Sequence, residues 1–118
     1  MTAPGTGTEG FIAGLRECGV EPAIQHEVVI FSVDVVGGAF DGSVVETGVS
    51  AAELGAWPAV PPHWVHLPPH VHFAQSNTQP SEVPGWTKHS RGIASWGDAQ
   101  APSQAYLAHV RGVLSEAA

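Results

Sequence analysis

The stretch WPAVPPHWVHLPPHVHF, residues 57–73, decides how this chain can fold. It holds five of the ten prolines, and proline fixes φ, lacks an amide donor and pushes the preceding residue into an extended conformation. Helix is therefore excluded here. We expect a short strand over residues 63–67 between two rigid Pro-Pro corners, which would hold the histidine and tryptophan side chains at fixed positions.

Composition narrows the class of protein. The 118 residues suffice for one domain with its own core, and only 13% of them are charged. The formal net charge is -7, and the four lysines and arginines are scattered along the chain. The cationic surface that nucleic acid requires is therefore missing, and we exclude that class of partner.

Three further features indicate where the protein works. The lone cysteine, Cys18, cannot form an internal disulfide, which is typical of a reducing compartment. No apolar run reaches the length of a membrane span, about 18 residues. The N-terminus lacks a basic and then apolar signal pattern. We therefore expect a cytoplasmic protein without a membrane partner.

The N-terminal region is predicted to be a tail followed by a helix. Residues 1–8 are small and polar, so we expect a flexible tail, with a single domain over residues 9–118. The helix should follow Thr8, its capping residue, and stop at Gly19. Its apolar stripe at helical spacing is Phe11, Ile12, Leu15 and Cys18. This spacing places Cys18 on the apolar face.

The chain then changes to a strand pattern. Residues Gln25–Val36 carry apolar side chains on both faces, which predicts a central strand. Two Gly-containing turns lead to a returning strand, Ser43–Val49. The 57–73 stretch should supply a third strand and, at His70–Phe73, a candidate fourth. Residues Ala74–Gly85 read as a polar loop without regular structure, of a length that is often functional.

A second amphipathic helix is expected from Ser103 onward. Pro102 fits its first turn, and Ser103 or Asp98 lies near its start. Its apolar stripe is Tyr106, Leu107, Val110, Val113 and Leu114. The order helix, antiparallel strands, irregular segment, helix predicts an α+β fold with the helices packed on one sheet.

The histidines of the 57–73 stretch are candidate metal ligands. His63 and His66 lie three residues apart on a strand and should point to opposite faces, whereas His70 and His72 lie two apart and should share one. The second pair could hold a divalent ion if His89 or Glu82 came near as a third ligand. The spacing matches no familiar zinc motif, and solvated or hydrogen-bonded histidines are the simpler interpretation. We therefore predict no metal and no cofactor.

A catalytic nucleophile is hard to assign. Cys18 on an apolar helix face is typical of a small core residue rather than of a reactive thiol. The candidate catalytic residues are His89, Ser90 and Arg91, with His63 or His66 as further histidines. Sequence neighbours rarely meet as nucleophile and base, and no Gly-x-Ser-x-Gly elbow is present. The alternative interpretation of this segment is a polar loop held by the flanking tryptophans.

Two groups of motifs resemble the ubiquitin-conjugating-enzyme fold. Residues 57–62 (WPAVPP) stand where that fold has its Tyr-Pro-x-x-Pro-Pro turn, and residues 64–67 (WVHL) follow as its next strand. Residues 85–91 (GWTKHSR), Trp96 and residues 106–111 (YLAHVR) with Leu114 look like the bacterial branch named ubiquitin-conjugating-like family protein E. The resemblance implies a UBC-like fold, an antiparallel β-meander flanked by an N-terminal and a C-terminal helix.

The resemblance also implies partners, with one departure. Members of that branch are associated with ubiquitin-like proteins, ThiF-type activating enzymes and JAB-type proteases. Conjugating enzymes carry a thioester-forming cysteine after the proline turn, usually behind a His-Pro-Asn step. Here no cysteine follows Phe73, and Cys18 belongs to the first helix. Thioester transfer therefore does not carry over with the fold.

The leading hypothesis is a cysteine-less domain of a bacterial ubiquitin-like conjugation or defence pathway, which acts by binding rather than as an enzyme. Exposed aromatic residues beside rigid prolines make good protein-contact surface. The predicted partner-binding residues are Trp57, Pro61, Pro62, His63, Trp64, Trp86 and Trp96. The alternatives are a histidine-based enzyme that uses His89 with Ser90 or Arg91, a histidine-rich metal-binding domain, and a structural subunit without a site.

Overall fold

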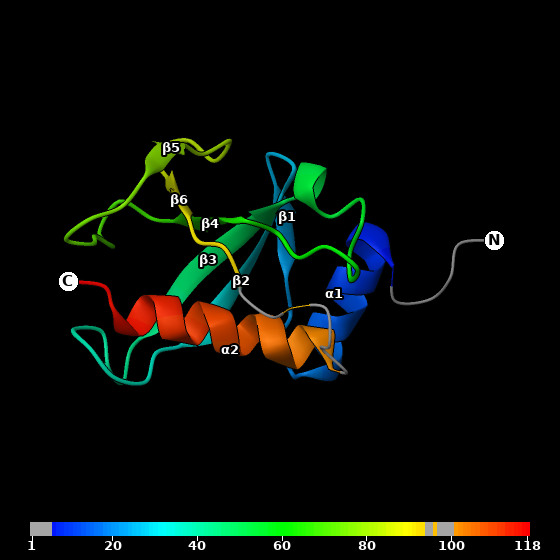
Figure 1. Cartoon of the computed structure of the whole chain (residues 1–118), viewed down its shortest axis with the longest axis horizontal. Coiled ribbons are helices and arrows are strands. Elements are labelled where there is room, and N and C mark those ends of the chain that lie inside the picture. The colour runs from blue at the N-terminus through cyan, green and yellow to red at the C-terminus, as the bar shows by residue number, and fades with distance from the viewer. Residues whose placement is uncertain (1–5, 94–95, 97–100) are drawn as a thin grey trace.

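The computed structural model of the chain describes residues 6–93, 96 and 101–118. In this part lie two helices, α1 (Gly7–Glu17) and α2 (Pro102–Ser115), and a turn of 3-10 helix, η1 (Ala51–Glu53). The strands of the same residues are β1 (Ala23–Gln25), β2 (Val28–Asp34), β3 (Val44–Ser50), β4 (Trp64–Leu67), β5 (Thr78–Pro80) and β6 (Thr87–Ser90). They form one antiparallel sheet in the order β1-β2-β3-β4-β6-β5 (Figure 1). The α+β class is thus confirmed.

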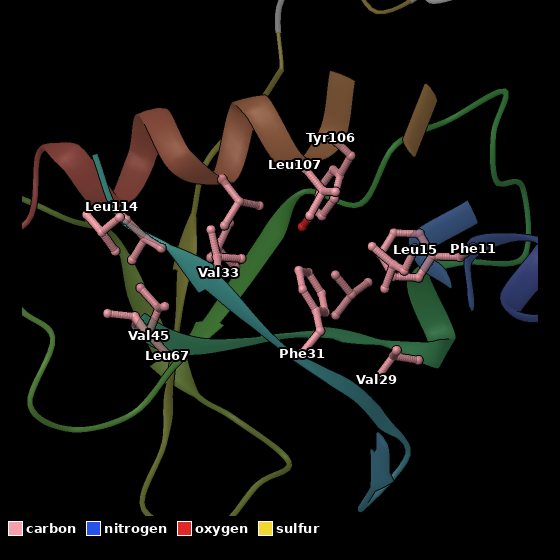
Figure 2. Close-up of a cluster of buried hydrophobic side chains, with 14 of the residues drawn as sticks. Phe11, Leu15, Val29, Phe31, Val33, Val45, Leu67, Tyr106, Leu107 and Leu114 are labelled. Atoms are coloured by element: carbon pink, nitrogen blue, oxygen red, sulfur yellow. The ribbon is translucent and has the colours of Figure 1, made fainter. Parts of the chain in front are cut away.

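Both helices pack against one face of the sheet, which we call the front face. The side chains of β2 that point there, including Phe31 and Val33, meet Phe11 of α1 and Leu107 of α2 in one buried cluster (Figure 2). Each such side chain contributes about 1.5–3 kcal/mol when fully buried. Neither helix in the described residues is both long and apolar enough to cross a bilayer.

The opposite, or back, face carries a smaller apolar cluster. Val28 and Ile30 of β2 point away from the helices and pack against Val83, with Trp86 at the edge of the cluster. Strand β2 is therefore apolar on both faces and lies inside the sheet, as its sequence predicts.

The prediction of one strand over Gln25–Val36 is wrong, because the chain turns inside it. Gln25 pairs with Val28, so His26 and Glu27 form a two-residue hairpin loop. Both have positive φ, 51° and 63°, the combination that a type I′ turn requires. The strand that follows is β2, and the returning strand, β3, lies within one residue of its predicted bounds.

Regular structure after β4 also differs from the expectation. Strand β4 agrees with the predicted third strand to within one residue, but no strand forms at His70–Phe73. Instead, β5 lies inside the segment expected to be an irregular loop, and β6 follows Trp86. The chain turns at residues 69–70 and reaches the sheet again only at β5, so Pro68 and Pro69 end β4 without starting another strand.

The two helices begin close to where the sequence places them. Helix α1 starts at Gly7 with Thr6 at its N-cap position, so Thr8 is a helical residue rather than the cap. Residues 1–5 of the expected tail lie outside the described residues. Helix α2 starts at Pro102, which occupies the first turn as expected, and Ser103 is its second residue. Asp98 falls outside the part of the chain that the structure describes.

Candidate functional site

Two of the four tryptophans are core residues. Trp57 is 2% exposed, and its ring packs edge-on against Phe11 at a centroid distance of 4.9 Å. Trp96 lies 5.5 Å from Trp57 and donates its indole N–H to the carbonyl oxygen of Pro58 at 2.7 Å. Neither ring offers appreciable surface to a partner, which corrects their assignment as contact residues. They fix the proline turn against both helices.

The other predicted contact residues lie beside this turn, and most remain accessible. His63 is exposed, Pro61, Trp64 and Trp86 are half-buried, and only Pro62 is buried. The backbone amides of His63 and Trp64 both donate to Oε1 of Glu53, at 3.0 and 3.3 Å. This anchor fixes where the turn enters β4. Trp64 and Trp86 both lie on the back face, where Lys88 covers the Trp64 ring at 5.3 Å.

The structure does not bring His89 and Ser90 together. They are neighbours on β6 and therefore point to opposite faces of the sheet. Ser90, opposite Trp64, faces the back and forms its side-chain hydrogen bond with Nε2 of His63. His89, opposite Val65, faces the front. The predicted pairing of His89 with Ser90 is therefore wrong.

His89 meets a different serine, Ser76, which lies in the loop before β5. The Ser76 hydroxyl lies 2.8 Å from Nδ1 of His89 and accepts a hydrogen bond from Nη1 of Arg91 at 3.1 Å. The ring of Phe73 packs against both partners, at 4.9 Å from the His89 ring and 4.6 Å from the Arg91 guanidinium carbon. The structure thus places His89 and Arg91 in one cluster together with Ser76.

The donor and acceptor roles in this cluster follow from its chemistry. A guanidinium group only donates, so the Ser76 oxygen accepts from Arg91 and its own proton is free to be donated to Nδ1 of His89. Burial lowers the pKa of His89, and the nearby Arg91 and His72 lower it further. The imidazole is therefore mainly neutral at pH 7, and in the tautomer with its proton on Nε2 it accepts at Nδ1.

A cavity of about 390 Å³ opens beside the cluster. Ser76, His89 and His72 contribute polar groups to its lining, and Val71 and Phe73 form an apolar wall. None of the described residues that line it is acidic. The loop that contains Ser76 and Phe73 brings these residues over the front face at β6, where Thr78 of β5 lies opposite His89.

His66 belongs to a second, closed cluster on the back face. It is 0% exposed, and its Nδ1 lies 2.6 Å from the hydroxyl of Ser81, in the segment that crosses the back face. Lys88, next to His66 across the strand pair, forms an ion pair with Glu82 at 3.6 Å. Burial lowers the pKa of His66 to about 4. The His66 side chain is closed to solvent, which fits a structural role.

The histidines proposed as metal ligands do not assemble. His70 packs against Phe40 at a centroid distance of 6.0 Å, whereas His72 is close enough to His89 to influence its pKa. In the part of the chain that the structure describes, no three His, Cys, Asp or Glu side chains are grouped to hold a metal ion. The metal-binding alternative therefore has no ligand set among these residues.

Cys18 behaves as its helical position predicts. It is half-buried at the end of α1 and packs against the main core. Two cavities of about 280 and 560 Å³ border it, but the described residues that line them include no histidine. Among these described residues the thiol has no histidine to act as its base.

Sequence reasoning missed Ser76 as a member of the site. The only signal was the length of the Ala74–Gly85 loop, since loops of that size are often functional. Its partner His89 is 13 positions away in sequence, and the pairing of β5 with β6 brings the two together.

Comparison with known proteins adds no identification. No family model, no curated protein and no solved structure matches this chain.

Proposed function

We propose that this chain is a docking domain of the ubiquitin-conjugating-enzyme-like type. It would bind a ubiquitin-like protein or a ThiF-type activating enzyme in a bacterial conjugation or defence pathway that also uses a JAB-type protease. It would act in the cytoplasm. It would act by binding rather than by thioester transfer, because no cysteine follows the proline turn.

The observation that carries this proposal is the order of the elements around the proline turn. Helix α1 is followed by the consecutive antiparallel strands β1 to β4, and residues 57–62 lie between β3 and β4. A UBC-like fold, with its β-meander, proline turn and next strand, requires this order. Helix α2 then packs on the same core as α1, which fits the expected C-terminal helix.

The back face beside the turn is the surface that suits a protein partner. Trp64 is half-buried, and the charged Lys88 and exposed His63 surround it. The buried Trp57 and Trp96 hold the turn rigid, so little conformational freedom would be lost on binding. An aromatic residue on a rigid support, ringed by polar groups, is typical of interface hot spots.

The test is incubation with a ubiquitin-like protein, its ThiF-type activating enzyme and ATP, followed by size-exclusion chromatography and intact-mass spectrometry without reductant. We expect an unmodified chain that co-elutes with one of the two partners. Trp64→Ala should weaken that complex by about 2 kcal/mol, or roughly 30-fold in Kd.

Ile24→Ala provides the matched control. Ile24 is an exposed apolar residue, 60% accessible, on the opposite edge strand β1. Its truncation should leave Kd unchanged. A covalent adduct on the chain would contradict a binding-only role, and the absence of both adduct and complex would remove the docking function.

A further inference from the structure

The cluster of Ser76, His89 and Arg91 has a use beyond docking. We infer that Ser76 is a nucleophile activated by His89, and that the adjacent cavity accepts the acyl group of a small carboxylic ester. Three Ser–His side-chain contacts occur in the described residues, and this one borders a cavity of about 390 Å³.

The hydrogen-bond directions give Ser76 the arrangement of an activated hydroxyl. Its oxygen receives an N–H of Arg91 at 3.1 Å, and with the His89 proton on Nε2 its own proton is donated to Nδ1 of His89 at 2.8 Å. A hydroxyl oxygen has two lone pairs, so one remains free to attack a carbonyl carbon. This is the nucleophile–base distance that covalent catalysis needs.

Arg91 assists by charge. Salt bridges among the described residues pair Arg16 and Lys88 with glutamates but do not include Arg91. Its guanidinium contacts Phe73, the Ser90 carbonyl oxygen and the Ser76 hydroxyl. As the proton leaves Ser76, the positive charge stabilises the negative charge that develops on Oγ.

The reaction proceeds in two balanced steps. The Ser76 Oγ–H bond breaks and its proton moves to Nδ1 of His89, while Oγ forms a bond to the acyl carbon and the C=O π electrons move to the carbonyl oxygen. The carbonyl bond then re-forms as the bond from that carbon to the leaving alcohol breaks, and the alcohol oxygen takes the proton from His89. Water repeats the sequence on the resulting Ser76 ester, which releases the carboxylic acid and restores the hydroxyl.

The cavity sets the class of substrate. Its volume of about 390 Å³ suits a short acyl chain, which Val71 and Phe73 would contact. The described lining residues carry no carboxylate to repel the oxyanion of the tetrahedral intermediate. A neutral ester of a short-chain acid fits these walls.

The test measures release of p-nitrophenol from p-nitrophenyl acetate by the full chain. The parent chain and each variant carry Cys18→Ala, because the free thiol would otherwise react with the ester. We expect turnover in the parent chain and, after acid quench, one acetyl group on the peptide that contains Ser76. Ser76→Ala should lower the rate by about 10²-fold. Ser90→Ala, which removes the Ser–His contact on the back face, should leave the rate unchanged.

Two further variants separate chemistry from structure. His89→Gln keeps hydrogen-bonding groups but cannot take up the proton, so it should lose about as much rate as Ser76→Ala. Ser76→Cys places a stronger nucleophile at the same position and should restore acylation there. If the Ser76 hydroxyl only held the loop in place, Ser76→Cys would not restore acylation at this position.

The pH profile gives an independent readout. The rate should rise with pH through the pKa of His89, which lies below 6.5, and then level off. Arg91 and His72 are the charged and titratable groups that act on this histidine, with Phe73 and Thr78 as uncharged neighbours. Equal rates in Ser76→Ala and Ser90→Ala would overturn the inference. So would acetylation confined to other residues, or a parent rate no higher than that of free imidazole.

Discussion

His66 is a titratable side chain enclosed in the back of the sheet, and its environment has a measurable consequence. Its pKa falls from 6.5 to about 4 on burial, so the unfolded chain binds a proton that the folded chain does not between these two values. The contribution of His66 to the free energy of unfolding is therefore complete above pH 6.5 and is lost as pH falls toward 4. The loss between pH 7 and pH 5 should be about 2 kcal/mol for this group.

Urea denaturation of the parent chain and His66→Gln at pH 7 and pH 5 measures this contribution. Glutamine can keep a hydrogen bond to Ser81 but does not titrate, so the variant should lose about 2 kcal/mol less on acidification. Burial also lowers the pKa values of His89 and His109. Both chains retain these two histidines, so their contributions cancel when the acid-induced losses of the two chains are subtracted. Equal acid sensitivity of the two chains would contradict a neutral, buried His66.

Single-residue predictions from the sequence succeeded only inside regular strands. The two-residue period predicted that His63 and His66 point to opposite faces, but His63 precedes β4 and bonds Ser90 on the back face, where His66 also lies. The same period separates His89 from Ser90. Nothing local shows that Trp57 turns inward or that Ser76 reaches His89, because both contacts join segments far apart in sequence.

The turn between β2 and β3 shows how an element depends on one glycine. Gly38 has φ of 78°, and a Cβ built there would lie 2.1 Å from the carbonyl oxygen of Ser115 at the end of α2. Gly42, in the same turn, has φ of 82° with no atom within 4 Å of its Cβ position. Alanine at either site incurs a left-handed backbone cost of about 1–2 kcal/mol.

Gly38→Ala should therefore destabilise the protein by about 1–3 kcal/mol more than Gly42→Ala, since only the first also displaces the end of α2. Thermal denaturation of the two variants side by side measures the difference. Equal losses would mean that the turn moves freely away from the helix.

Elements with a strong period were predictable and weak ones were not. The apolar stripes of α1 and α2 and the alternation in β2 appear directly in the sequence. The β1–β2 hairpin was missed because His26-Glu27 lacks the Asn-Gly signal of a type I′ turn. Strand β5 was missed because it is three exposed residues long and ends in Pro80, which only an edge strand tolerates.

For the whole molecule, the sequence predicted the layering but not the full sheet. Helices on one face of an antiparallel meander follow from the order of patterns and the proline turn. The addition of β6 beside β4 could not be predicted, because its pairing is long-range. That pairing places Ser90 on the back face near His63, and the pairing of β5 with β6 forms the front-face cavity at His89.

Trp57 joins these parts into one cooperative unit, and its removal is the sharpest test of the fold. Its ring contacts Phe11 of α1, Tyr106 of α2 and Trp96, and its carbonyl oxygen accepts from the amide of Gly7 at 3.0 Å. Trp57→Ala should cost about 3–5 kcal/mol, a large share of the roughly 5–15 kcal/mol that holds a domain together. Urea denaturation followed by circular dichroism measures the loss.

Trp57→Phe and Trp64→Ala place that result in context. Phenylalanine keeps an aromatic ring against Phe11, so Trp57→Phe should lose less and remain folded. Trp64 is half-buried on the back face and contacts neither helix, so its truncation should cost about 1 kcal/mol. If Trp57→Ala and Trp64→Ala cost the same, Trp57 would not be the residue that couples the turn to both helices. The rigid support proposed for the docking surface would then have to come from elsewhere in the core.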